Sequence, residues 1–208
     1  MPWKVSLEAT SFNVPQFPAE GVPEIAMAGR SNVGKSTLVN ALLGAKLAHV
    51  GATPGKTRSV NFYAVKCATG ASKRERSFRL VDLPGYGYAS RSRTERREWS
   101  QLTSAYVEGR KSLILVCHLV DFRHGLLGND RLLQDWLDQR RRPVMVLFTK
   151  ADKITGSKRR GTLQQYVRDG LKSVDVPIVT SGEERCGIDE LKRFIEARVD
   201  ASMQEQAE

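Results

Sequence analysis

The sequence predicts a three-layer α/β fold, in which a mostly parallel β-sheet with one antiparallel hairpin strand carries helices on both faces. Short apolar segments alternate with amphipathic stretches along nearly the whole chain, which indicates successive β-α-β units. Residues 113–120 (LILVCHLV) are apolar throughout, as is typical of a strand buried on both faces of a parallel sheet. Residues 60–67 are followed by a polar turn and then by the apolar residues 78–81, which predicts a hairpin.

Each expected strand is a short run that is rich in apolar, aromatic or β-branched residues. In chain order these runs are residues 22–28, 60–67, 78–81, 113–120, 144–148 and 176–179. Each expected helix places apolar residues three and four positions apart, so that they share one face, as Leu38 and Leu42 do in the first helix. In chain order the helices are residues 35–45, 94–109, 130–139, 163–171 and 188–199. Glycine and proline between residues 46 and 58 predict a loop there.

The length and composition are those of one globular domain. The chain has 208 residues, of which 40% are hydrophobic and 27% charged. We expect an N-terminal extension over residues 1–21, a single domain over residues 22–200 and a disordered polar tail over residues 201–208. The net charge of +10 favours a polyanionic partner, although a merely basic surface remains the alternative.

Several classes of protein do not fit the sequence. It has no apolar run long enough for a transmembrane helix and no recognisable secretory signal near its start. Its three cysteines (Cys67, Cys117 and Cys186) fit neither a disulfide framework nor a zinc site, and we expect them to be reduced, packed residues of a cytoplasmic protein. Its three histidines show no ligand pattern with one another.

Ligands of doubly wound sheets bind beyond the carboxyl ends of the strands, so the loops after residues 28, 81, 148 and 179 are the candidate site. The first loop is a G-x-x-x-x-G-K-S phosphate loop, which follows an expected strand and opens an expected helix. Its backbone N–H groups would bind phosphate, Lys35 would reach the β- and γ-phosphates, and the Ser36 hydroxyl would ligate Mg²⁺. The expected contacts in this loop are Gly29, Arg30, Ser31, Asn32, Val33, Gly34, Lys35, Ser36 and Thr37.

The second loop is the D-x-P-G sequence Asp82, Leu83, Pro84 and Gly85. The Asp82 carboxylate could hold Mg²⁺ through a water molecule, while the Gly85 N–H faces the γ-phosphate. Alone, such a tetrapeptide is also found in ordinary turns. Its place after a hairpin strand, downstream of the phosphate loop, favours the functional interpretation.

The third and fourth loops would bind the base. Residues 149–152 (TKAD) fit the pattern [N/T]-K-x-D, in which the carboxylate of Asp152 accepts both donors of a guanine edge and the stem of Lys150 lies along the base. In isolation the tetrapeptide would be an ordinary solvated surface. In the fourth loop (Thr180, Ser181 and Gly182), a backbone N–H would meet the guanine O6.

A fifth element is the loop that contains Gly55, Lys56 and Thr57. A threonine there can cap Mg²⁺ and order the loop only when a triphosphate is bound, and we favour Thr57 over Thr53. The alternative is a mobile loop whose threonines have no such role.

The order of these motifs resembles that of the translation-factor-type GTPases. The stretches GRSNVGKSTLVNALL, TPGKTRSVNF, DLPGYGYA and TKADK together resemble the EngB (YihA/YsxC) family of bacterial ribosome-assembly GTPases, over residues 23–194. Thr149 departs from the asparagine that is commoner among GTPases but fits this family.

The resemblance implies a P-loop NTPase fold of the small-GTPase type and a GTP- and Mg²⁺-dependent factor that acts in the cytoplasm. Its implied role is in assembly of the large (50S) ribosomal subunit, with a link to cell division and septation. We expect a monomer that contacts ribosomal RNA or ribosomal proteins, and the basic run at residues 91–97 is the favoured contact.

Catalysis is expected to be slow, because Tyr86 stands where many GTPases place a water-orienting glutamine. A partner or a monovalent cation would complete it, and by resemblance to potassium-activated GTPases Asn32 is a candidate K⁺ ligand. Tyr86 and Tyr88 could stack on RNA bases or pack against the following helix. The residues expected to act in hydrolysis are Asn32, Lys35, Thr57 and Gly85, and the expected Mg²⁺ ligands are Ser36, Thr57 and Asp82.

Two other functions remain open at this point. A phosphate-loop ATPase or kinase would share the first loop but would not need the TKAD sequence. A non-hydrolysing module would use the nucleotide only to stabilise its structure.

Overall fold

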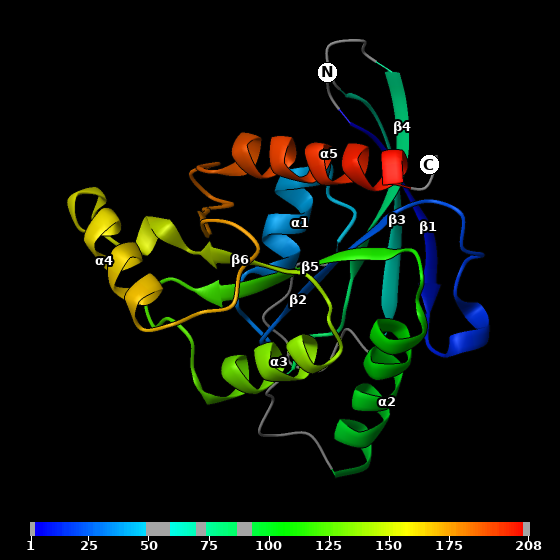
Figure 1. The fold of residues 1–208 in the computed structure, drawn as a ribbon, viewed down its shortest axis with the longest axis horizontal. Coiled ribbons are helices and arrows are strands. Elements are labelled where there is room, and N and C mark those ends of the chain that lie inside the picture. The colour runs from blue at the N-terminus through cyan, green and yellow to red at the C-terminus, as the bar shows by residue number, and fades with distance from the viewer. Residues whose placement is uncertain (1–2, 49–58, 70–73, 87–92, 206–208) are drawn as a thin grey trace.

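A central β-sheet divides the molecule into layers. The computed structural model describes residues 3–48, 59–69, 74–86 and 93–205. Over these residues the sheet has seven strands in the order β1-β3-β4-β2-β5-β6-β7 (Figure 1). The strands are β1 (Lys4–Ser11), β2 (Glu24–Gly29), β3 (Val60–Thr69), β4 (Arg74–Asp82), β5 (Leu113–Asp121), β6 (Val144–Thr149) and β7 (Ile178–Val179).

The pairing of the strands confirms the predicted fold class. Strands β4, β2, β5, β6 and β7 pair in parallel, whereas β3 pairs antiparallel with β4. Five α-helices connect or follow these strands within the described part of the chain. They are α1 (Lys35–Leu43), α2 (Arg93–Gly109), α3 (Gly128–Gln139), α4 (Gly156–Arg168) and α5 (Ile188–Glu205).

The two faces of the sheet bury separate hydrophobic cores. On β2, Ile25 and Met27 belong to one core and Ala26 and Ala28 to the other, as expected from the alternation of side chains along a strand. Helices α1 and α5 cover the first core and α2 and α3 the second, on opposite sides of the sheet in Figure 1. The parallel strands therefore have two buried faces, and their carboxyl ends open onto one edge of the sheet.

The structure adds detail at both ends of the chain. Within the expected N-terminal extension, residues Lys4–Ser11 form β1 and pair antiparallel with β3. The alternation of Val5, Leu7 and Ala9 was the available signal for this edge strand. At the other end α5 continues to Glu205, because Met203 packs against the first core, so the prediction of a disordered tail is wrong for residues 201–205. Residues 206–208 lie outside the described part.

A buried ion cluster closes the end of the sheet that lies away from the predicted site. Glu24, at the start of β2, is fully buried. Its carboxylate accepts hydrogen bonds from Arg110 at 2.7 and 2.9 Å, from Arg79 at 3.1 Å and from the Tyr106 hydroxyl at 2.9 Å. Arg79 also donates two hydrogen bonds of 2.8 Å to Glu8. One carboxylate thus joins β2 to β4, to α2 and, through Arg79, to β1.

The three cysteines are unpaired, as the sequence predicts. Cys67 and Cys117 are buried and Cys186 is half-buried, and all three are free thiols. Among the described residues, no helix combines the length and the apolar character needed to cross a membrane.

Candidate functional site

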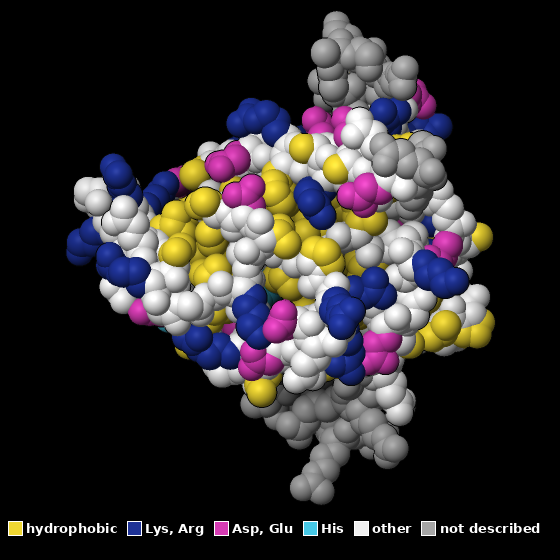
Figure 2. All heavy atoms as spheres, viewed as in Figure 1, with side chains coloured by type: hydrophobic (Ala, Val, Ile, Leu, Met, Phe, Trp, Pro, Cys, Tyr) yellow, Lys and Arg dark blue, Asp and Glu magenta, His cyan; other side chains and the backbone are white. Residues whose placement is uncertain are grey.

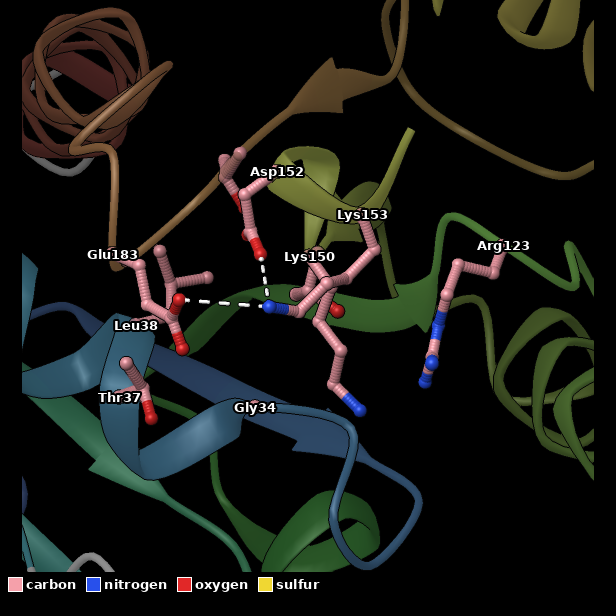
Figure 3. Close-up of a pocket in the computed structure, with 11 residues that line it drawn as sticks. Gly34, Thr37, Leu38, Arg123, Lys150, Asp152, Lys153 and Glu183 are labelled. Atoms are coloured by element: carbon pink, nitrogen blue, oxygen red, sulfur yellow. Dashed lines mark ion pairs between the residues drawn. The ribbon is translucent and has the colours of Figure 1, made fainter. Parts of the chain in front are cut away.

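The predicted loops converge at the carboxyl ends of β2, β4, β6 and β7. A cavity of about 260 Å³ lies between the phosphate loop, the start of α1 and the loops that follow β5, β6 and β7 (Figure 3). Its lining residues are Gly34, Thr37, Leu38, Arg123, Thr149, Lys150, Asp152, Lys153, Thr180, Gly182 and Glu183. Residues of three of the four predicted loops therefore line one cavity together with the start of α1, and the D-x-P-G loop is not among its lining residues.

The phosphate loop begins at the last residue of β2 and leads directly into α1. Gly34 has a φ of +100° just before the helix, a conformation that a side chain would strain. A Cβ atom at Gly29 would lie 2.9 Å from the Val33 side chain and 3.0 Å from the Leu119 Cβ, so there is no space for it. The loop thus holds its N–H groups at a helix N-terminus, an arrangement suited to an anion.

Lys35 and Asp82 face each other beneath this loop. Both are buried, with exposed fractions of 8% and 2%, and the Lys35 amine donates a short hydrogen bond to Asp82 Oδ1. Asp82 is the last residue of β4, so parallel pairing with β2 brings it next to the phosphate loop. The predicted phosphate ligand and the predicted metal ligand are therefore together.

The segment after Asp82 packs directly on the phosphate loop. The Ser31 N–H donates to the Tyr86 carbonyl at 2.9 Å, and the Tyr86 N–H donates to the Gly29 carbonyl at 3.2 Å. A Cβ atom at Gly85 would lie 3.0 Å from Ser31 Cα. Leu83 and Pro84 are buried. The predicted γ-phosphate sensor is thus in contact with the predicted phosphate loop.

The TKAD loop is tied to the phosphate loop by two side chains. The buried Thr149 hydroxyl donates to the Val33 carbonyl at 2.6 Å. The Lys150 amine donates to the Asn32 carbonyl at 2.7 Å. Thr149 therefore uses its single hydroxyl to link β6 to the phosphate loop.

Asp152 lines the cavity, and its carboxylate contacts Ser181 and Lys153. Its Oδ1 accepts from the Ser181 hydroxyl at 2.7 Å, and this bond lowers the pKa of Asp152. Its Oδ2 is buried, lies 3.0 Å from the Lys153 amine, and accepts no well-aligned hydrogen bond from the described residues. Figure 3 shows Lys153 between Asp152 and Glu183. The carboxylate is ionised and able to accept hydrogen bonds from a ligand.

The loop after β7 packs against the end of β6, the TKAD loop and α1. The Thr180 hydroxyl donates to the Phe148 carbonyl at 3.0 Å and the Thr180 carbonyl accepts from Ala151 N–H at 3.1 Å. A Cβ atom at Gly182 would lie 2.6 Å from the Thr37 side chain, so this glycine packs tightly against α1.

Sequence reasoning missed Asp121 and Arg123. Asp121 accepts from Arg123 at 2.7 and 2.9 Å and pairs with Lys150 at 3.0 Å. Burial would raise the pKa of Asp121, but these cations outweigh it and hold the pKa well below its ordinary value. Asp121 therefore fixes the amine of Lys150 beside the phosphate loop. The signal was its place at the carboxyl end of the buried strand β5.

Some predicted residues lie outside the described part of the chain. These are Thr53, Gly55, Lys56, Thr57 and Tyr88. The basic run at residues 91–97 lies outside the described residues or, from Arg93 on, outside the described side chains.

A strand, a phosphate loop and a helix, with D-x-P-G and T-K-x-D loops beside them, define a phosphate-loop protein of the GTPase class. A sequence profile described as "50S ribosome-binding GTPase" matches residues 24–150. The chain belongs to the EngB family of GTP-binding proteins and is a GTPase. The predicted family, fold class and enzymatic class are thus confirmed, and the ATPase or kinase alternative is set aside.

Individual relatives support this assignment. The chain is 41% identical over 190 residues to the probable GTP-binding protein EngB of Syntrophomonas wolfei, covering 91% of this chain and 93% of that protein. It is 43% identical over 187 residues to the probable GTP-binding protein EngB of Alkaliphilus oremlandii, covering 87% of this chain and 84% of that protein.

Solved structures agree on the fold. A crystal structure of a probable GTP-binding protein engB has a TM-score of 0.61 at 24% identity, over 86% of this chain and 99% of that one. Aquifex aeolicus Era bound to GDP.AlF4- has a TM-score of 0.71 at 23% identity, over 86% of this chain. The chain spans 57% of the length of that Era chain.

Proposed function

We propose that this GTPase is a nucleotide-controlled switch in assembly of the large ribosomal subunit, acting in the cytoplasm and needed for normal cell division and septation. The observation that carries the switch is the contact of Gly85 and Tyr86 with the phosphate loop, because a bound γ-phosphate would meet that contact directly. The family description as 50S ribosome-binding supports the partner. A related fold, Era with a TM-score of 0.68 at 22% identity, is solved with MgGDPNP and nucleotides of 16S ribosomal RNA.

The residues at the phosphate end fit Mg²⁺. The Ser36 hydroxyl and the Asp82 carboxylate are the hard oxygen donors that this ion prefers, and Asp82 is held at the end of β4. Bound there, the ion would neutralise charge on the phosphates. Lys35 would add its charge to the same phosphates, Gly85 would donate its N–H to the γ-phosphate, and Thr57 keeps its predicted role in sensing it.

The base would be recognised at the other end of the cavity. Asp152 would accept the two donors of the guanine edge, Ser181 would hold that carboxylate in position, and a backbone N–H of the Thr180–Gly182 loop would donate to O6. The link from Lys150 to Asn32 would keep the base and phosphate subsites at a fixed separation.

Slow hydrolysis is proposed because the residue after Gly85 has no side-chain group near the phosphates. The ring of Tyr86 is buried, with 8% of its surface exposed, and points toward β5 and α3. It therefore neither orients a water molecule nor offers a face for stacking on RNA.

Asn32 leads to a prediction about K⁺. Its side chain is exposed beside the phosphate subsite and its carbonyl accepts from Lys150, so a potassium ion held there would compensate charge that develops between the phosphates. GTP hydrolysis should be about 10²-fold faster in KCl than in NaCl, the lower end of the effect expected for one group that stabilises charge in the transition state. Asn32→Ala should abolish the difference in steady-state phosphate release.

The control for this prediction takes the backbone into account. Asn32 has a φ of +63°, which strains alanine but not glycine, so Asn32→Gly should give the same result as Asn32→Ala. Asn13→Ala, at an exposed position outside the cavity, should keep the full potassium effect. Equal wild-type rates in the two salts would rule out the ion.

The ribosomal partner is tested by sedimentation. We expect the protein to co-sediment with 50S subunits or their precursors in a non-hydrolysable GTP analogue and to remain in the supernatant in GDP. Increasing salt should weaken this binding, because a basic protein on RNA displaces counterions. Equal sedimentation in the two nucleotides would contradict the switch.

The basic side chains do not mark the contact surface by themselves. Figure 2 shows Lys and Arg spread over the visible face rather than gathered in one patch. Three consecutive arginines stand at residues 140–142, and two of them have partners within the chain. Arg140 pairs with Glu108 at 2.5 Å, and Arg142 donates to the carbonyls of Glu108 and Arg110. These two arginines therefore have intramolecular roles.

A further inference from the structure

A buried polar cluster lies behind the phosphate loop. The Tyr86 hydroxyl donates to Asp130 Oδ1 at 2.7 Å and lies 2.8 Å from His118 Nε2. A phenol has one proton, so with that proton directed to Asp130 the His118 Nε2–H donates to the Tyr86 oxygen. Asp130 and His118 are fully buried.

Asp130 connects this cluster to the phosphate loop as well. Its Oδ2 accepts from the Leu127 N–H at 2.9 Å, at the start of α3, and lies 3.2 Å from Arg30 Nε. Burial would raise the pKa of Asp130, but the interactions with His118, Tyr86 and the Leu127 N–H outweigh it and hold the pKa below its ordinary value. One buried anion on α3 therefore holds a residue of the phosphate loop and the tyrosine that follows Gly85.

The backbone of Tyr86 continues this connection. Its carbonyl accepts a hydrogen bond from the Ser31 N–H, and its own N–H donates to the Gly29 carbonyl. The segment from Gly85 to Tyr86 is therefore in direct contact with the phosphate loop. A Cβ atom at Gly85 would already lie 3.0 Å from Ser31 Cα, so a γ-phosphate between the loop and the Gly85 N–H would require this segment to shift. A shift that withdraws the Tyr86 hydroxyl removes a donor from a carboxylate that is out of contact with water, which is costly.

We propose that Asp130 and His118 are positioning residues that hold Tyr86 inward, keep the segment against the phosphate loop and so lower the affinity for GTP relative to GDP. The inference rests on the proposed role of Gly85 as the γ-phosphate sensor. It assigns to α3 a part in setting the nucleotide preference, through a residue that does not touch the nucleotide.

The test removes one oxygen atom from the cluster. In the full chain, Tyr86→Phe keeps the ring and removes the hydroxyl. We expect the affinity for a non-hydrolysable GTP analogue, relative to that for GDP, to rise about tenfold or more, as for loss of a hydrogen bond to a charged group. Fluorescence titration with labelled nucleotides measures both dissociation constants. Asp130→Asn, which removes the charge, should shift the ratio in the same direction.

Tyr106→Phe is the matched control. The Tyr106 hydroxyl is also buried and also donates to a buried carboxylate, Glu24, at 2.9 Å, but at the opposite end of β2. This variant should lose stability while its nucleotide ratio stays within twofold of the wild type. A wild-type ratio in a folded Tyr86→Phe, or an equal shift in Tyr106→Phe, would overturn the inference. Failure of the proposed function would appear separately, as ribosomal sedimentation that ignores the nucleotide.

Discussion

Asp152→Asn should lower the affinity for guanine nucleotides by about 10⁴-fold, the scale on which a site built to bind a polar group rejects a ligand that lacks the match. The carboxylate lines the cavity, with one oxygen bonded to Ser181 and the other 3.0 Å from the Lys153 amine, and its remaining lone pairs are the acceptors for the guanine edge. An asparagine amide in its place would direct its own N–H group at the two N–H donors of the guanine edge. Titration with GDP measures the loss.

The same variant should gain affinity for xanthine nucleotides, because the 2-oxo group of xanthine accepts the amide N–H that the substitution introduces. This gain distinguishes a change of specificity from unfolding. Asp169→Asn, an equal chemical change at an exposed position after α4, should leave both affinities unchanged. An Asp152→Asn variant that loses both nucleotides equally would argue against the base-reading role.

Glu24→Ala should reduce the free energy of unfolding by about 3–5 kcal/mol, the usual effect of removing one partner from a buried ion pair. The side chain is fully buried, and its loss leaves Arg79 and Arg110 without the carboxylate that joins them. Arg79 would still pair with Glu8, so most of the free-energy cost of an unpaired buried charge would come from Arg110. Urea denaturation followed by circular dichroism measures the change.

Glu108→Ala provides the comparison. Glu108 also pairs with an arginine, Arg140, but both side chains are partly exposed, at 47% and 31%. Water and salt screen such a pair, so its removal should cost less than about 1 kcal/mol. Similar losses in the two variants would mean that the Glu24 cluster contributes no more than a surface pair.

The fold and the placement of the candidate loops at one edge of the sheet could be predicted because they depend on local patterns. Periodicity located the central strands and helices, and parallel pairing then placed the loops after β2, β4, β6 and β7 at one edge. Asp121 was missed although it obeys the same rule, since no familiar motif marks the loop after β5. The cluster of Tyr86, His118 and Asp130 could not be read from the sequence, because its members come from separate elements and meet only through the packing of α3 on the sheet.

β1 is an edge strand of the described sheet, so a shortened chain without it would expose β3. β1 pairs with residues 60–66 of β3, with a register shift between Leu7 and Ala9. Removal of residues 1–11 would leave the backbone N–H and C=O groups along the outer edge of β3 unpaired. Unpaired strand edges of this kind pair with other chains and promote aggregation. β1 is itself an edge strand of the described sheet, but its register shift between Leu7 and Ala9 interrupts the regular pattern that such pairing needs, so its outer edge should pair less readily than the edge of β3.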